Sequence, residues 1–193
     1  MIQKFLVPLF AFAALAAETA SAQVSCQPGT SGVIACPCAN NPSGLGRGCN
    51  NSLNTGGAAL SATGSPSLSA DNIQFNCTGI GTATPSCSGT NVNVISLLYE
   101  GTTPISAGVA WGDGVICTGG PFYLLNAQVS NGGIYHWPVP GTTGVSAMAI
   151  SLGDPLSSGQ TRHYFVAYRD SCPSFCTASL RQKSNSWSLT WTP

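Results

Sequence analysis

The chain has 193 residues, of which 6% are charged and 43% hydrophobic, and its formal net charge is zero. A soluble domain of ordinary composition carries about 25% charged residues, so serine, threonine, asparagine and glycine must supply most of this polar surface. The hydrophobic content excludes the composition of a disordered chain, and the zero net charge excludes a basic nucleic-acid-binding surface or a polybasic membrane patch.

The first 22 residues are typical of a secretory signal peptide. Lys4 supplies the positive charge, Phe5–Ala17 is a short apolar run, and Ala20-Ser-Ala22 matches the small-x-small cleavage pattern. The apolar run is shorter than the ~20 residues that span a bilayer. We therefore expect cleavage before Gln23, no membrane span in the mature chain, and a secreted or cell-surface location outside the cytoplasm.

The mature chain divides by composition into residues 23–55 and residues 56–193. The first part is rich in cysteine and glycine and lacks hydrophobic periodicity, which predicts an irregular segment stapled by disulfides. In the second part, short β-favouring runs alternate with turn signals at Gly101-Thr-Thr-Pro104, Asn131-Gly-Gly133, Pro140-Gly141 and Gly153-Asp-Pro155. The candidate strands are Ala58–Thr63, Leu68–Asn76, Val92–Tyr99, Gly108–Cys117, Phe122–Val129, Ile134–Trp137, Val145–Leu152, Arg162–Arg169 and Ser186–Thr192.

This pattern predicts an all-β fold, a single antiparallel β-sandwich or jelly-roll-like domain with the stapled segment at its N-terminus. The run Arg162–Arg169 is largely apolar on both faces, which predicts a central strand. Near the C-terminus, Trp187, Leu189 and Trp191 share one face of a strand, and we expect that face to lie in the core.

Nine cysteines follow the expected cleavage site, and in an exported chain this density predicts disulfides rather than a metal site. Cys77 and Cys87 bracket a short loop-like segment and are expected to pair locally, and Cys117 is expected to pair with Cys176. Because nine is odd, one cysteine must stay unpaired or bridge two chains, and Cys172 is the one that we expect. The others are expected to pair among themselves or with the nearby domain: Cys26, Cys36, Cys38 and Cys49.

Several motifs recur in a fixed order: Cys36-Pro-Cys-Ala-Asn-Asn41, Gly48-Cys-Asn-Asn-Ser52, Gly56-Gly-Ala58, Ala62-Thr-Gly64, Trp111-Gly-Asp-Gly114, Cys117-Thr-Gly-Gly120, Tyr164 to Tyr168-Arg-Asp170, Phe175-Cys176 and Leu189-Thr-Trp-Thr-Pro193. Together they resemble a recurring disulfide-containing β-domain of unknown function found in secreted proteins of environmental bacteria. The resemblance covers residues 36–193, implies an extracytoplasmic β-domain and transfers no catalytic residue. In this chain the domain directly follows the expected signal peptide, and Cys172 and the Cys77–Cys87 segment look like additions to the pattern.

Residues that could carry catalysis are few. The histidines are His136 and His163, and the sequence contains no Gly-x-Ser-x-Gly elbow, zinc-protease motif, phosphate loop or dinucleotide fingerprint. Glu100 and Asp113 are the first carboxylate pair to test for glycoside hydrolysis. Asp113 lies between two glycines, which indicates a turn, with calcium binding as the alternative. We expect no cofactor, no metal and no enzymatic activity.

The leading hypothesis is a secreted, non-catalytic structural or adhesive protein that self-assembles at the cell surface or in the matrix through edge strands, the C-terminal one included. The alternatives are a carbohydrate-binding module and a small secreted hydrolase. The expected partners are a second copy of the chain or extracellular glycans, and no nucleic acid. Core packing is the simpler explanation for most of the aromatic residues, and those near predicted loops are the best candidates for exposure. The candidate binding residues are Trp111, Asp113, Tyr135, His136 and Trp137.

Overall fold

The computed structural model describes residues 22–24, 26–84, 86–88 and 93–193, so the expected signal peptide lies outside the described residues except for its last position, Ala22. The elements are β1 (Ala22–Val24), β2 (Ala59–Thr63), β3 (Gln74–Thr78), β4 (Ile95–Trp111), β5 (Gly114–Val129), β6 (Tyr135–Trp137), α1 (Val145–Ser151), β7 (Thr161–Arg169), β8 (Arg181–Lys183) and β9 (Trp187–Thr190). The fold is mostly β, as the alternation of β-favouring runs and turns predicts.

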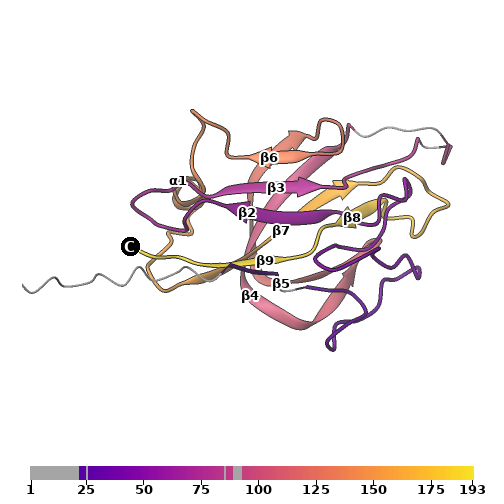
Figure 1. Cartoon of the computed structure of the whole chain (residues 1–193), viewed down its shortest axis with the longest axis horizontal. Helices are drawn as coiled ribbons and strands as arrows, with labels where there is room; N and C mark the ends of the chain where they lie inside the picture. Colours follow the sequence, from indigo (N-terminus) through magenta and orange to yellow (C-terminus); the bar gives the residue numbers. More distant parts are fainter. Residues whose placement is uncertain (1–21, 25, 85, 89–92) are drawn as a thin grey trace, which may run out of the picture.

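The strands form two antiparallel sheets that pack face to face (Figure 1). The larger sheet has the order β1-β9-β7-β4-β5, with β8 also paired to β7, and the smaller sheet has the order β2-β3-β6. The predicted antiparallel sandwich is therefore confirmed. β7 lies between β9 and β4, so the prediction that Arg162–Arg169 forms a central strand is also confirmed.

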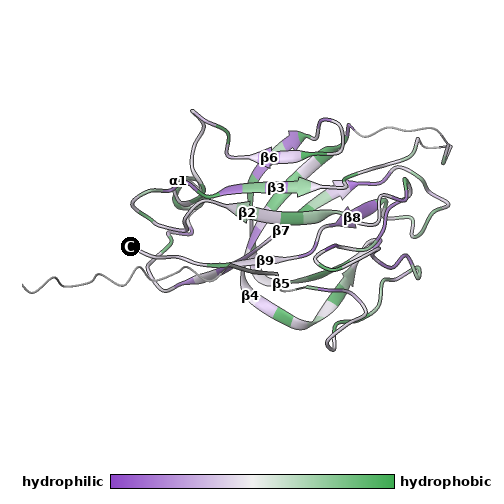
Figure 2. Ribbon diagram, in the orientation of Figure 1, coloured by the Kyte–Doolittle hydropathy of each residue, from purple (hydrophilic) through white to green (hydrophobic). Residues whose placement is uncertain are grey.

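The main core lies between the two sheets, and hydrophobic segments occur on strands of both (Figure 2). Phe75 of β3 contacts Tyr164 of β7 with their ring centroids 4.7 Å apart. Trp191 is fully buried and donates a hydrogen bond from its indole N–H to the Tyr164 hydroxyl over 3.1 Å. Leu189 is buried and Trp187 packs against the same core. The apolar face predicted at the C-terminus is therefore a core face.

The C-terminal strand, however, is not an edge of its sheet. Residues 22–24 pair with residues 187–189, so β9 has a hydrogen-bonded neighbour on each side. The expectation that the C-terminal strand offers a free edge for self-assembly is wrong, because a strand from the other end of the chain covers it. β5 is the last strand at the opposite end of the larger sheet.

The β4–β5 hairpin differs from the predicted strand pattern. The turn predicted at Gly101-Thr-Thr-Pro104 lies inside β4, and the chain reverses at Gly112-Asp113, where Trp111 pairs with Gly114. The pairing of β4 with β5 shifts its register at these turn residues, between Gly101 and Thr103 and between Pro104 and Val109. A bulge tolerates a residue without a ladder hydrogen bond, which is how a strand can contain glycine and proline.

Residues 145–152 were expected to form a strand, but Val145–Ser151 is the helix α1. Val145 and Ala149, one helical turn apart, are fully buried. The Asp71 carboxylate accepts hydrogen bonds from the backbone N–H groups of Ser146 (2.9 Å) and Ala147 (3.1 Å). A short apolar run is compatible with the period of a strand and with that of a helix. The cap supplied by Asp71 and the core contacts of Val145 and Ala149 stabilise the helix.

Four disulfides link the chain: Cys26–Cys117, Cys36–Cys49, Cys38–Cys176 and Cys87–Cys172. The N-terminal cysteines thus pair both among themselves and with the β-domain, as expected. The predicted pairs Cys77–Cys87 and Cys117–Cys176 are wrong, and so is the expectation that Cys172 is unpaired.

Cys77 is the free cysteine, and it is fully buried. It faces the core from β3 two residues after Phe75, on the same side of the pleat, so its thiol points away from the loop that carries Cys87. Four disulfides indicate an oxidising, extracytoplasmic compartment. No helix among the described residues has the length and apolarity needed to cross a membrane.

Candidate functional site

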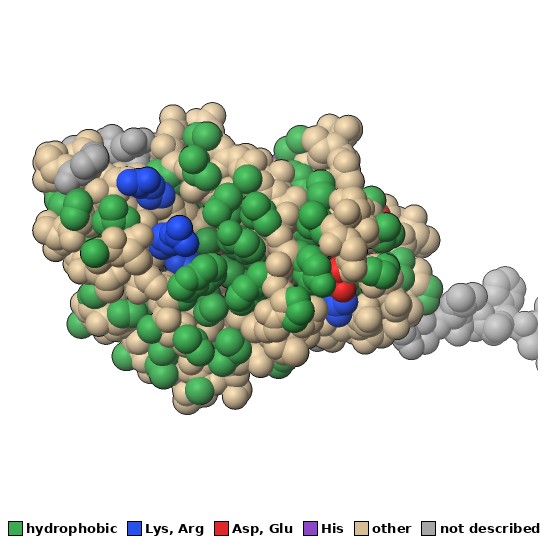
Figure 3. Space-filling model, turned by 180° about the vertical axis from the view of Figure 1, so that it is seen from behind, with side chains coloured by type: hydrophobic (Ala, Val, Ile, Leu, Met, Phe, Trp, Pro, Cys, Tyr) green, Lys and Arg blue, Asp and Glu red, His purple; other side chains and the backbone are tan. Residues whose placement is uncertain are grey.

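The outer face of the larger sheet, which points away from the smaller sheet, is also apolar. Tyr164 and Val166 of β7 face the main core, whereas Phe165 and Ala167 alternate to the outer face and form a second cluster with Ile116. Seen from behind, hydrophobic side chains gather in the middle of this face, and basic side chains lie beside them (Figure 3). A sheet that is apolar on both faces normally buries both, so this outer face calls for an explanation.

Four aromatic rings form the centre of this outer face. We call Tyr99, Trp111, Phe122 and Phe165 the aromatic cluster. Trp111 and Phe122 are stacked with centroids 6.0 Å apart and an interplanar angle of 7°, and Tyr99 stacks on Phe165 at 5.4 Å. Phe165 is fully buried beneath the other rings, whereas Phe122 is 41% exposed. The rings hold one another in place and still present aromatic surface to solvent.

A cavity of about 350 Å³ lies beside the aromatic cluster. We call it the basic hollow, because three cations contribute to its wall along with Tyr99 and Trp111. The apolar part of the lining comes from Ile95, Leu97, Ala167 and Leu180, and the cations are Arg169, Arg181 and Lys183. Its volume is at the small end of the range of ligand pockets, about 300–1,000 Å³, and suits one or two rings of a larger ligand.

The two arginines of the basic hollow face each other across a strand pair. Arg169 of β7 is the register partner of Arg181 of β8, and both side chains are exposed. Like charges directly opposite each other on neighbouring strands destabilise a sheet. Within the described residues, ion pairs involve Arg162 alone, so neither of these arginines is neutralised by a carboxylate.

Lys183 is fully buried, which is unusual for an unpaired lysine. Its Nζ makes no hydrogen bond in the described part of the chain and lies 4.7 Å from the centroid of the Trp111 ring. Burial, opposed by the negative charge of Asp113 and reinforced by the positive charge of Arg181, lowers the pKa of Lys183 to about 7. A basic group therefore lies within the wall of the hollow, over the face of an aromatic ring.

The acidic residues of the described chain are all engaged away from the arginine pair. Asp71 caps α1, Glu100 and Asp154 lie around Arg162, Asp113 accepts hydrogen bonds from Thr177, and Asp170 accepts them from Ser52 and Thr82. The protein is neutral overall, but its charges are not evenly distributed. The two arginines of the basic hollow form no ion pair with a carboxylate of the described protein.

The sequence-predicted binding residues do not form one site. Trp111 lines the basic hollow. Tyr135 and Trp137 are buried in the main core, so core packing, the simpler explanation, holds for both rings and they offer no exposed binding surface. They pair with Cys77 and Phe75 in the smaller sheet, and this register turns both rings inward. His136, between them, faces the other way and its Nδ1 is hydrogen-bonded to the side chain of Asn76.

Asp113 lies in the β4–β5 turn, as its flanking glycines predict. It does not cap its own turn, because its carboxylate accepts hydrogen bonds from the backbone N–H of Thr177 (2.9 Å) and from the Thr177 hydroxyl. The described residues contain no cluster of three or more histidine, cysteine or acidic side chains that could hold a metal ion. Asp113 thus joins the hairpin to the segment after Cys176.

Glu100 and Asp113, the carboxylate pair considered for glycoside hydrolysis, lie in different surroundings. Glu100 faces the core, with one carboxylate oxygen 3.6 Å from Nε of Arg162, whereas Asp113 is at the hairpin turn. The second histidine, His163, is buried, and its Nδ1 is 2.8 Å from the Ser188 hydroxyl oxygen. Burial lowers the pKa of His163. These contacts are those of structural side chains.

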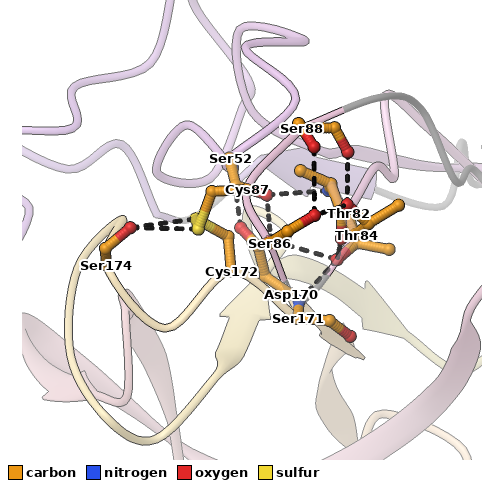
Figure 4. Close-up of a disulfide and its surroundings, with 11 residues drawn as sticks. Ser52, Thr82, Thr84, Ser86, Cys87, Ser88, Asp170, Ser171, Cys172 and Ser174 are labelled. Atoms are coloured by element: carbon orange, nitrogen blue, oxygen red, sulfur yellow. Dashed lines mark hydrogen bonds between the residues drawn. A yellow bond between two sulfur atoms is a disulfide. The ribbon is translucent and has the colours of Figure 1, made fainter.

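A second polar cluster surrounds the Cys87–Cys172 disulfide (Figure 4). Asp170 is buried and accepts hydrogen bonds from the backbone N–H and hydroxyl of Ser52 and from the hydroxyl of Thr82, the latter over 3.1 Å. The cluster therefore ties together three segments that are distant in sequence.

Sequence reasoning missed most of the basic hollow. Its cations come from two strands, and the strand that contains Arg181 and Lys183 is too short and polar to be predicted. One signal was available, because four of the five basic residues after the expected cleavage site lie between positions 162 and 183. Comparison of the chain with protein-family models, with curated proteins and with solved structures finds no match. The family resemblance of the motifs stays a prediction.

Proposed function

We propose that the protein is a secreted, non-catalytic binding protein that attaches to extracellular polysaccharide through the outer face of its larger sheet. The observation that carries this proposal is the aromatic cluster, which is rigidly packed and yet open to solvent at Phe122. The C–H faces of sugar rings stack on aromatic side chains, and a platform that is already ordered loses little entropy on binding. The adjacent cavity can take a substituent of the stacked sugar.

Self-assembly, the leading hypothesis from composition, receives less support. The C-terminal strand is not a free edge, and the free cysteine is buried, so it cannot bridge two copies on the surface. A second copy would also bring its own arginines to any contact across this face. The carboxylates that could neutralise them are all engaged elsewhere in the described residues.

The test is binding of the purified mature protein to cellulose, chitin, xylan, pectin and alginate, measured by depletion from solution. We expect binding to at least one polymer. Replacing the exposed ring by Phe122→Ala should weaken it about tenfold, since an aromatic contact contributes about 0.5–1.5 kcal/mol beyond its buried area. The matched control is Ile134→Ala, which removes an apolar side chain of similar exposure (51%) in the turn before β6 and should leave binding unchanged.

Two results would contradict the proposal. One is equal binding by the Phe122→Ala and Ile134→Ala variants, which would place the contact elsewhere. The other is failure to bind any polymer, combined with a wild-type dimer that Phe122→Ala converts to a monomer in sedimentation experiments. That second result would assign the outer face to a second copy of the chain.

A further inference from the structure

We infer that the ligand of this face is an acidic polysaccharide, whose uronic-acid carboxylates bind the Arg169–Arg181 pair while its sugar rings stack on the aromatic cluster. This inference rests on the proposed function and adds the chemical class of the ligand. The basic residues around the hollow are the reason to infer an acidic glycan instead of a neutral one.

Neither arginine of the pair has a carboxylate partner within the described part of the chain. The two residues are directly opposite in the β7–β8 ladder, where like charges repel. A ligand carboxylate between them would replace this repulsion by attraction. The planar guanidinium fork matches the two oxygens of a carboxylate and can bind it in a bidentate manner.

Lys183 is an independent observation that points to the same sign of charge. Its buried Nζ has no hydrogen-bond partner among the described residues and lies over the ring of Trp111, and both residues line the hollow. Charging a buried amino group that has no hydrogen-bond partner is costly, and an anion in the hollow would offset that cost. Its charge acts through a medium of low dielectric, where the potential is screened less than in water.

The aromatic and basic parts of the site are adjacent, which favours a sugar that carries its own carboxylate. Trp111 belongs to the aromatic cluster and also lines the same cavity as both arginines. A uronic acid combines an apolar ring face with a carboxylate on the ring. One residue of such a polymer can therefore meet both parts of the site at once.

The decisive experiment compares polygalacturonate with the same polymer after full methyl esterification, which keeps the sugar rings and removes the charge. We expect the wild-type protein to bind the free acid at least about tenfold more tightly than the ester at low salt, and to lose this preference as the salt concentration rises. Dextran sulfate, which carries sulfates instead of carboxylates, serves as the second anion. It should bind more weakly than polygalacturonate.

Variants of the arginine pair and of the aromatic cluster test the carboxylate contact and the ring stacking separately. The double variant Arg169→Gln/Arg181→Gln should lose the preference for the free acid and bind the free acid and the ester with similar affinity. Arg47→Gln is the matched control, since its guanidinium contacts the carbonyl of Gly57, away from the hollow, and it should keep the preference. Phe122→Ala should weaken binding of both polymers.

Each contrary outcome has a distinct meaning. Equal binding of ester and free acid would overturn the acidic-ligand inference and leave the proposed function standing. A preference that survives Arg169→Gln/Arg181→Gln would place the anion elsewhere and overturn it as well. Tighter binding of dextran sulfate would overturn the assignment to carboxylates. Failure to bind any polysaccharide would overturn both proposals.

Discussion

At the scale of single residues, the buried ionisable groups lie in two opposite electrostatic settings. On the core side of the larger sheet, Arg162 donates two hydrogen bonds to Asp154, over 3.0 and 3.1 Å, and its Nε lies 3.6 Å from a carboxylate oxygen of Glu100. On the outer face, Lys183 has no such partner. The first arrangement is an ion-pair network, whereas the second is a buried amino group without a hydrogen-bond partner beside a cavity.

Glu100 makes the stability of the protein depend on pH. Burial raises its pKa from 4.5 to about 7; a hydrogen bond with Tyr164 and the charge of Arg162 oppose this shift, whereas Asp154 adds to it. Because the folded-state pKa lies above that of the unfolded chain, this stabilising contribution is fully present below pH 4.5 and is lost as the pH rises through about 7.

The variant Glu100→Gln should remove this dependence. Relative to the wild type, its unfolding free energy should improve between pH 5 and pH 8 by up to about 3 kcal/mol, the upper limit set by the pKa shift. Urea denaturation of both proteins at each pH measures the difference. A difference that stays constant over this range would contradict the prediction.

At the scale of elements, β8 is the short strand on which the basic hollow depends. The N-terminal segment holds one side of it, where the Gln182 side chain donates a hydrogen bond to the carbonyl of Asn50 over 2.7 Å. The β4–β5 turn holds it at Arg181, whose carbonyl accepts a hydrogen bond from the backbone N–H of Asp113 over 2.8 Å. The N-terminal motif and the Trp-Gly-Asp-Gly motif thus both contribute to placing Arg181 and Lys183.

Gly48 allows the N-terminal segment to approach β8 this closely. A Cβ atom at this position would collide with the Lys183 carbonyl oxygen and lie 2.8 Å from the carbonyl carbon of Ser184. Gly48→Ala should therefore lower the unfolding free energy by about 1–3 kcal/mol, the usual cost of overpacking. Gly44→Ala is the control, because a Cβ there has no neighbour within 4 Å. Equal thermal stability of the two variants would refute the close-packing argument.

At the scale of the whole molecule, two disulfides fasten the N-terminal segment to the β-domain, Cys26–Cys117 and Cys38–Cys176. They close loops of 91 and 138 residues, so they restrict the unfolded chain more than the local Cys36–Cys49 bridge does. With so few charges available, these bridges and the polar networks hold irregular segments that would otherwise have little core of their own.

The disulfide pattern predicts the thiol content of the protein in each state. The native protein should not react with Ellman's reagent, because Cys77 is fully buried and burial raises the pKa of its thiol. Unfolding in guanidinium without reductant should expose one thiol per chain, and peptide mapping should locate it at Cys77. Labelling at Cys172, or more than one thiol, would contradict the pairing.

Some features of this protein follow from the sequence alone. The all-β class, the central position of residues 162–169 and the burial of Leu189 and Trp191 all follow from side-chain periodicity. Periodicity is a local property, because a pleated strand sends alternate side chains to opposite faces whatever its neighbours are. The oxidised state of most cysteines follows from their number and the expected export.

Tertiary structure alone decided the rest. The partner of each cysteine, the helical state of residues 145–151 and the facing of Arg169 and Arg181 depend on contacts between segments far apart in the chain. Strand register fixes such contacts, and a shift of one residue would turn each side chain to the opposite face. The basic hollow exists because one register brings β8 beside β7, and no local pattern in the sequence specifies that register.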